Sequence, residues 1–161
     1  VGLEPGEGAK LGRALQNLAD VGEPMVEGDL PFFFHVPRSG GSTMKDILGM
    51  CFKKVAASDV GARHGHKYDK KLEVLTSEDG SHFVNVDTTT AEGIYRAKNL
   101  GLVESHMADV IITQLVHAGA TMFNENQRGR MFTIMRHPIE RAVSLFHYLS
   151  VADWEPTYDP D

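Results

Sequence analysis

The chain has 161 residues, of which 42% are hydrophobic and 24% charged, an ordinary composition for one globular domain with a sizeable core. The formal net charge of -6 disfavours a general nucleic-acid-binding protein, so any anion site has to be local. The single cysteine, Cys51, excludes an internal disulfide and a cysteine-rich zinc site. No apolar run approaches the length of a membrane span, so we expect no membrane contact from this segment.

The first 30 residues are interpreted as an N-terminal extension of an α/β domain that covers residues 31–161. They are rich in glycine and acidic residues, and a short amphipathic pattern predicts a peripheral helix at most, at Leu11, Leu15 and Leu18. The domain begins with a compact apolar run at residues 32–36, between two prolines. Such a run predicts a buried strand.

A helix is expected after this strand, because apolar residues recur at helical spacing at Met44, Ile47, Leu48 and Cys51. Ser42 or Thr43 is its expected N-cap. Residues 53–80 are polar and rich in lysine and histidine, which predicts a long excursion on the surface.

Strands and helices alternate along the rest of the chain. Further strands are predicted at 82–86, 108–113 and 131–135, and a turn is predicted at 128–130. Helices are predicted at 91–99, 114–123 and from Pro138 onward, and the apolar face of the last helix consists of Ile139, Ala142, Val143, Phe146 and Leu149. This alternation indicates a parallel sheet covered by helices on both sides.

The sequence RSGGST joins the first strand to the first helix. In this arrangement, free backbone N–H groups and a helix N-terminus meet at one point and can bind a phosphate-like anion. Gly40 and Gly41 allow close approach, Ser42 and Thr43 offer hydroxyl donors, and Arg38 adds a fixed charge. The alternative is a capped turn with nothing bound, because short glycine motifs often occur by chance.

The loop of a nucleoside triphosphatase would read G-x-x-x-x-G-K-[ST], with a lysine directly before the hydroxyl residue. Here Gly41 precedes Ser42, and the basic residue stands ahead of the turn. This difference counts against hydrolysis of ATP or GTP.

A second group of residues lies in FTIMRHPIERAVSLFHY. Arg136 ends the last predicted strand and Ser144 lies in the next helix, which brings both to the carboxyl edge of a parallel sheet, where the glycine turn also lies. They could share a second phosphate. The alternatives are an ion pair between Arg136 and Glu140 and a solvated position for Ser144.

The segments FFHVPRSGGSTM and RHPIERAVSLFHY together resemble the sulfotransferases that use 3'-phosphoadenosine 5'-phosphosulfate (PAPS), particularly the carbohydrate-type, membrane-anchored branch. The family's first motif holds the 5'-phosphosulfate and matches residues 37–43. Its second motif holds the 3'-phosphate through an arginine and a serine eight positions later, and these match Arg136 and Ser144. The resemblance implies a P-loop-NTPase-like sulfotransferase fold, PAPS as donor, 3',5'-ADP as product and no metal.

Two departures from the family pattern stand out. The family usually has lysine where this chain has Arg38, and arginine keeps the charge but does not readily release a proton. The family's catalytic domain also continues well past the second motif, so the chain is expected to be the N-terminal part of such a domain. The resemblance further implies a Golgi-lumenal, membrane-anchored full-length protein, with a cytoplasmic one as the alternative.

Transfer to a hydroxyl calls for a base, and carbohydrate sulfotransferases often carry a histidine in the interval where His106 lies. The resemblance therefore implies His106 as the base, with Glu104 in reserve; the alternative is a histidine in a loop at the start of a strand. His35 is interpreted as a core or supporting residue. His64 and His66 are interpreted as part of a solvated loop.

The sequence therefore predicts a sulfotransferase that moves the sulfuryl group of PAPS to a hydroxyl, with a carbohydrate as the expected acceptor and no nucleic-acid partner. Its expected catalytic residues are Arg38 and His106, and its expected cofactor-binding residues are Arg38, Ser39, Gly40, Gly41, Ser42, Thr43, Arg136 and Ser144. The alternative from a different class is a non-catalytic nucleotide- or anion-binding module. A nucleoside kinase is a third, less favoured alternative.

Overall fold

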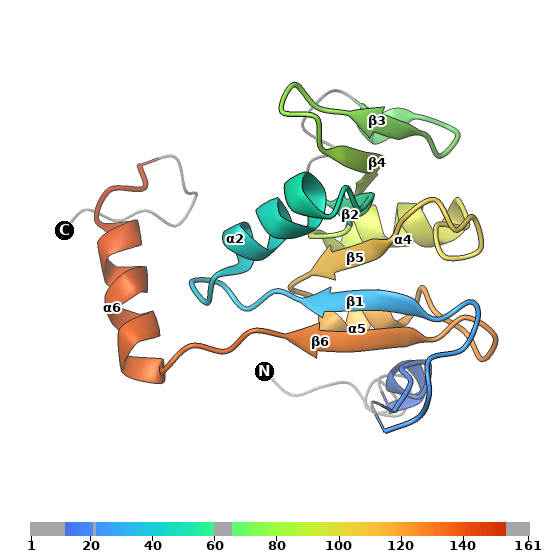
Figure 1. Ribbon diagram of the computed structural model, residues 1–161, viewed down its shortest axis with the longest axis horizontal. Coiled ribbons are helices and arrows are strands. Elements are labelled where there is room, and N and C mark those ends of the chain that lie inside the picture. The colour runs from blue at the N-terminus through green and yellow to red at the C-terminus, as the bar shows by residue number, and fades with distance from the viewer. Residues whose placement is uncertain (1–11, 21, 60–65, 154–161) are drawn as a thin grey trace.

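The structure, a computed structural model, describes residues 12–20, 22–59 and 66–153 (Figure 1). Its centre is one six-stranded sheet in the order β3-β4-β2-β5-β1-β6. The strands are β1 (Leu30–Phe34), β2 (Ala56–Ser58), β3 (Val74–Thr76), β4 (His82–Asp87), β5 (Val110–Thr113) and β6 (Gly129–Thr133). Every neighbouring pair is parallel except β3 and β4. The predicted α/β class is confirmed, and this architecture is compatible with a P-loop-like fold.

Helices cover both faces of the sheet. The helices are α2 (Gly41–Asp46), continued by the π-helical turn η1 (Ile47–Cys51), the short 3-10 turn η2 (His66–Tyr68), α4 (Ala91–Asn99), α5 (Val116–Ala120) and α6 (Pro138–Leu149). Figure 1 shows α2 on one side of the sheet and α4 and α5 on the other. The helix predicted at 91–99 is confirmed, and Pro138 occupies the first turn of α6 as expected.

The alternation of side chains along β1 builds the two halves of the core. Phe32 packs with Ile94 of α4 and with Phe123, whereas Phe33 packs with Ile112 and with Met44 of α2. Successive residues of a strand point to opposite faces, so one apolar run supplies both cores. β1 is also hydrogen-bonded on both edges, to β5 and β6, and three of its five residues are buried.

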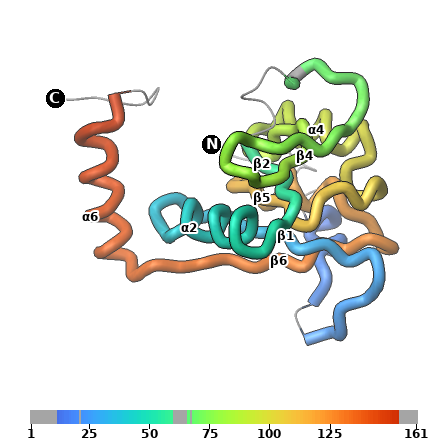
Figure 2. Tube along the Cα trace, turned by 45° about the horizontal axis from the view of Figure 1, so that its top comes forward, coloured from blue at the N-terminus to red at the C-terminus, as the bar shows by residue number. Residues whose placement is uncertain are grey.

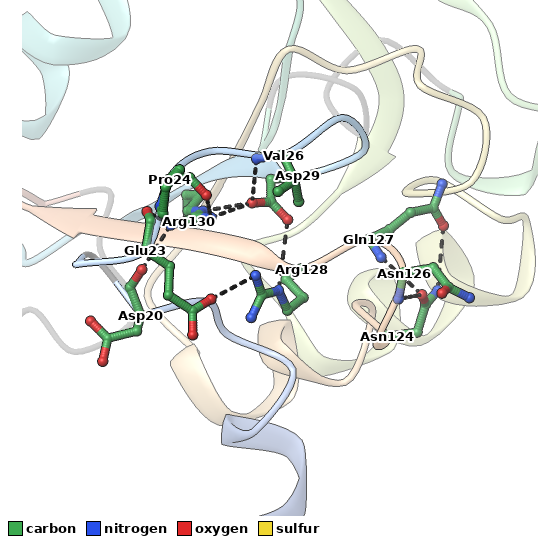
Figure 3. A network of polar contacts seen from close by, with 10 residues as sticks. All are labelled: Asp20, Glu23, Pro24, Val26, Asp29, Asn124, Asn126, Gln127, Arg128 and Arg130. Carbon is green, nitrogen blue, oxygen red and sulfur yellow. Dashed lines mark hydrogen bonds and ion pairs between the residues drawn. The ribbon is translucent and has the colours of Figure 1, made fainter.

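The segment before β1 lies along β6 and is fixed by polar contacts. Asn17 Nδ2 donates to the carbonyl oxygen of Phe123 at 2.7 Å, and Leu18 forms a parallel bridge with Gly129. Figure 3 shows a second set of contacts, in which Arg130 Nε donates to the buried carboxylate of Asp29 at 2.7 Å. The other Arg130 nitrogens donate to the carbonyl oxygens of Asp20, Glu23 and Pro24. One arginine therefore ties the start of β6 to the N-terminal segment.

Several predicted boundaries are wrong. Residues 53–80 are not only a surface excursion, because β2 and β3 lie within them and β2 is an inner strand between β4 and β5. Residues 128–130 are not a turn, because β6 begins at Gly129 and Asp29 neutralises Arg130 there. The helix expected at 114–123 is limited to α5. The N-cap of α2 is Gly40 in a left-handed conformation, not Ser42 or Thr43.

Helix α6 stands apart from the sheet. In Figures 1 and 2 it follows an extended segment after β6 and lies beyond the start of α2. None of its residues is fully buried, and its predicted apolar face is largely exposed, with Ile139 69% and Phe146 70% accessible. Hydrogen bonds between Arg38 and Ser144 and between Arg141 and Pro37 connect the helix to the glycine turn.

Candidate anion-binding site

The turn between β1 and α2 passes through two left-handed residues. The N–H of His35 donates to the carbonyl oxygen of Thr113 at 2.8 Å, which extends the β1–β5 pairing by one residue. The chain then turns at Arg38, with φ 63°, and at Gly40, with φ 93°. Glycine adopts such values freely, whereas an arginine with positive φ is uncommon and is held there by its surroundings.

The second glycine is needed for a different reason. A Cβ atom built on Gly41 would lie 1.9 Å from Nε2 of His35, so the imidazole occupies the space that any side chain would need. At Gly40, in contrast, no atom lies within 4 Å of such a Cβ. The backbone conformation therefore requires one glycine, and the packing of His35 requires the other.

The two sequence motifs meet at one pocket. It has a volume of about 290 Å³ and is lined by His35, Arg38, Gly40, Gly41, Ser42, Arg136 and Ser144. Arg136 lies in the segment between β6 and α6, and Ser144 lies in α6, so the pocket lies at the carboxyl edge of the neighbouring parallel strands β1 and β6. A cluster of cationic and hydroxyl donors of this kind suits an oxyanion.

Contacts from α6 hold Arg38 in this pocket. Arg38 Nε donates to Ser144 Oγ at 3.2 Å, and the guanidinium carbon lies 4.5 Å from the centre of the Tyr148 ring. One further contact fixes the turn itself, since Arg141 Nε donates to the carbonyl oxygen of Pro37 at 2.9 Å. A cation over an aromatic ring gains about 0.5–2 kcal/mol, so α6 restrains the arginine that faces the pocket.

A second pocket adjoins the first and shares three of its residues. It has a volume of about 400 Å³ and is lined by Arg38, Arg136, Ile139, Glu140, Val143, Ser144 and His147. Arg136 is paired with Glu140, one turn along α6, at 3.4 Å, which is the ion pair considered as an alternative role for this arginine. The pair is exposed and therefore weak, so it leaves the guanidinium able to contact a ligand.

Ser39 and Thr43, two of the predicted cofactor-binding residues, do not line either pocket. Ser39 is 5% exposed, and its hydroxyl oxygen is buried without a hydrogen-bond partner among the described residues. Such a group costs about 1–3 kcal/mol. Thr43 lies on the exposed side of α2. Side-chain contacts of the first motif with a ligand in the pocket are therefore limited to Arg38 and Ser42.

His106 and Glu104 are not brought to this pocket. His106 Nε2 lies 3.0 Å from Nε2 of Gln127, and Asn124 Nδ2 lies 3.3 Å from a carboxylate oxygen of Glu104. Both precede β5, and a residue that precedes a parallel strand lies at the amino edge of the sheet. The rise of about 3.3 Å per residue along β1 separates the two edges by roughly 13 Å. The structure therefore does not bring His106 or Glu104 to the anion pocket.

Sequence reasoning missed His35 as a pocket residue and Tyr148 as the ring that stacks with the Arg38 guanidinium. The alternation along β1 was a usable signal, since His35 is two residues after Phe33 and so points to the same side as α2. Tyr148 is one helical turn after Ser144, which brings both to the same face of α6. Burial, followed by the charge of Lys45, lowers the pKa of His35, and Asp59 opposes this shift.

Comparison of the chain with protein-family models, with curated proteins and with solved structures gives no match. Within the part of the chain that the structure describes, no helix is long and apolar enough to cross a membrane. The same residues contain no group of three or more histidine, cysteine or acidic side chains that could hold a metal ion. The two motifs and the geometry of the pocket are therefore the features that bear on function.

Proposed function

We propose that this protein is a sulfotransferase that transfers the sulfuryl group of PAPS to a hydroxyl, with carbohydrates as the acceptor class. The observation that carries the proposal is the meeting of two motifs at one pocket, where Arg38 contacts Ser144 and Arg136 lies alongside. Two arginines from separate motifs around one glycine turn suit a ligand with two anionic ends. A Golgi-lumenal, membrane-anchored full-length protein belongs to the same proposal.

The residues present fit such a ligand. The backbone at Gly40 can approach an anion closely, because no side chain and no neighbouring atom lies there. Arg136 and Ser144 come from the other wall of the pocket. The adjoining pocket adds apolar walls at Ile139 and Val143, and small-molecule sites combine such walls with a few polar groups.

Bound PAPS would supply an activated sulfuryl group, and its transfer would leave 3',5'-ADP. Arg38 would neutralise the negative charge that develops on the leaving oxygen. Arg136 and Ser144 would orient the nucleotide through the 3'-phosphate. We assign no base, because His106 and Glu104 lie at the opposite edge of the sheet.

A non-catalytic nucleotide- or anion-binding protein is the second candidate. The positions of His106 and Glu104 favour it, because both expected bases are away from the pocket. Such a protein would bind 3',5'-ADP but would not transfer sulfate.

Calorimetric titrations with 3',5'-ADP, 5'-AMP and ATP test the proposal. We expect 3',5'-ADP to bind at least about tenfold more tightly than 5'-AMP, because one charged contact contributes about 1.5–3 kcal/mol. The preference should shrink in Arg136→Ala and Ser144→Ala. Arg13→Ala is the control. Arg13 lines a separate pocket together with Glu104, so this variant should keep the preference for 3',5'-ADP.

Equal affinities for 3',5'-ADP and 5'-AMP in the parent protein would contradict the proposal of one ligand with two anionic ends. Transfer of radiolabelled sulfate from PAPS to carbohydrate acceptors then separates the two candidates. A protein that prefers 3',5'-ADP but transfers no label is a binding protein.

A further inference from the structure

His35 lines the anion pocket together with Arg38 and Arg136. It directly follows β1, and its imidazole stacks on Phe33 with ring centroids 5.9 Å apart and an interplanar angle of 22°. Its Nε2 atom lies against the backbone of Gly41, in the space that a Cβ there would need. The ring is therefore held between the strand and the start of α2, at the wall of the pocket.

The groups around His35 determine its charge in the free protein. Lys45 of α2 and Asp59, the residue after β2, face the imidazole and form an ion pair with each other at 2.7 Å. Burial is the largest cause of the lowered pKa of His35, and the charge of Lys45 is the second largest. Among the described residues, no hydrogen bond to the imidazole counters these effects. The ring is therefore neutral near neutral pH and can gain a proton.

A bound oxyanion changes this balance. The charge of Lys45 disfavours a further cation at His35 in the free protein, and Arg38 and Arg136 line the same pocket. A dianion in the pocket offsets these charges and offers an acceptor to an imidazole N–H, so it favours the protonated ring.

We infer that His35 is a direct contact of the bound oxyanion, and that a dianion binds with uptake of one proton from solvent by His35. The inference rests on the anion site of the proposed function, although not on sulfuryl transfer. At mildly acidic pH, the protonated imidazole of His35 is then a third cationic contact in the pocket, beside Arg38 and Arg136. Binding at this site should therefore depend on pH, although guanidinium groups do not titrate in this range.

Inorganic sulfate is the probe for this inference, because it stays a dianion from about pH 5 to 8 and any pH dependence then belongs to the protein. Calorimetry would give the sulfate Kd across this range, and buffers with different ionisation enthalpies would give the number of protons taken up. In the parent protein, affinity should rise as pH falls, by up to about tenfold per pH unit, the slope for one proton. Proton uptake near neutral pH should be positive.

Two variants locate the proton. His35→Gln should bind sulfate with little change across the pH range and with little proton uptake. His82→Gln is the matched control, since His82 begins β4 at the amino edge of the sheet and hydrogen-bonds to Thr76. It should keep the slope of the parent. His147→Gln tests whether the histidine of the adjoining pocket, and not His35, is responsible for the pH dependence.

Several results would overturn the inference. These are no sulfate binding to the parent, no proton uptake by the parent, or a pH slope that survives in His35→Gln or disappears in His147→Gln. The parent measurements need no variant, so they decide the matter even if His35→Gln is unstable. Proton-linked sulfate binding without a preference for 3',5'-ADP would refute the proposed function and leave this inference intact.

Discussion

Arg38 and Ser144 lie 106 residues apart in the sequence, and Arg38 Nε donates a hydrogen bond to Ser144 Oγ at 3.2 Å. The same guanidinium lies over the ring of Tyr148, one helical turn further along α6. A lysine, which the resembled family usually has at this position, offers neither a planar group to stack nor a second nitrogen to donate at the same time. The surroundings therefore match arginine rather than lysine.

Arg38→Lys should weaken binding of 3',5'-ADP by about tenfold, and Arg38→Ala by about 100-fold. Lysine keeps the charge but loses the stacking and the fork of donors, whereas alanine removes a charged contact worth about 1.5–3 kcal/mol. Calorimetric titration measures both. Tyr148→Phe keeps the stacking ring and should bind close to the parent value. An Arg38→Ala variant with the parent affinity would remove Arg38 from the site.

Gly41→Ala should lower the free energy of unfolding by about 1–3 kcal/mol, because its methyl group would overlap the imidazole of His35. The loss should largely disappear in the background His35→Ala, which clears the space. Gly40→Ala is the matched control: its cost of about 1 kcal/mol comes from φ 93° and should not depend on residue 35. Urea unfolding of the three single variants and the two double variants gives the coupling. A cost of Gly41→Ala that is equal in both backgrounds would refute the packing argument.

Arg130→Ala should lower the free energy of unfolding by about 3–5 kcal/mol, since it leaves the carboxylate of Asp29 buried without its closest partner. It also removes three hydrogen bonds to backbone carbonyl groups (Figure 3). Arg128→Ala is the control, because Arg128 pairs at 2.8 Å with the half-exposed Glu23 and reaches Asp29 only at 3.9 Å, so its loss should cost about 1 kcal/mol or less. The midpoint of urea unfolding compares the two, and equal losses would contradict the dominant role of Arg130.

The pH dependence of stability should carry a contribution from Asp29. Burial by itself raises the pKa of Asp29, but hydrogen bonds from Arg130 and Val26 and the charges of Arg130 and Arg128 outweigh it and hold the pKa below 3.8. A carboxyl whose pKa is lower in the folded state stabilises the fold above the unfolded value, and this stabilisation is lost as pH falls through the folded pKa.

The variant Asp29→Asn tests this sign. It should be less stable than the parent near neutral pH, and the difference should shrink as pH falls below 3.8. Thermal unfolding at a series of acidic pH values measures the difference. A constant difference across the series would mean that Asp29 does not titrate with folding.

His106→Ala should leave the affinity for 3',5'-ADP within about twofold of the parent, because His106 contacts Gln127 at the other edge of the sheet. If sulfate transfer is detected, turnover should also change little, whereas loss of a general base costs about 10²–10⁴-fold. Single-turnover transfer of labelled sulfate measures this. A loss on that scale would restore His106 as the base.

Much of the fold was predictable because its signals are local. The runs predicted as strands at 32–36, 82–86, 108–113 and 131–135 correspond to β1, β4, β5 and β6, with ends that differ by up to two residues. Apolar runs bounded by prolines, glycines and polar residues carry this information in a few neighbouring positions. The order of strand, glycine turn and helix likewise predicted that Arg136 and Ser144 would share an edge with Arg38, because parallel strands end on the same side.

Contacts between distant segments decided the rest. β2 consists of Ala56, Ala57 and Ser58, none of which favours a strand, and it exists because β4 and β5 pair with it on either side. The sequence predicts Arg130 in a turn, whereas the structure shows it in β6, paired with the buried Asp29. The side chain of His35 lines the anion pocket because α2 folds back over β1 and because Gly41, at the start of α2, has no side chain to occupy the space of the imidazole. The first two outcomes depend on partners far away in the sequence, and the third depends on the packing of α2 against β1. Local propensity carries no information about either.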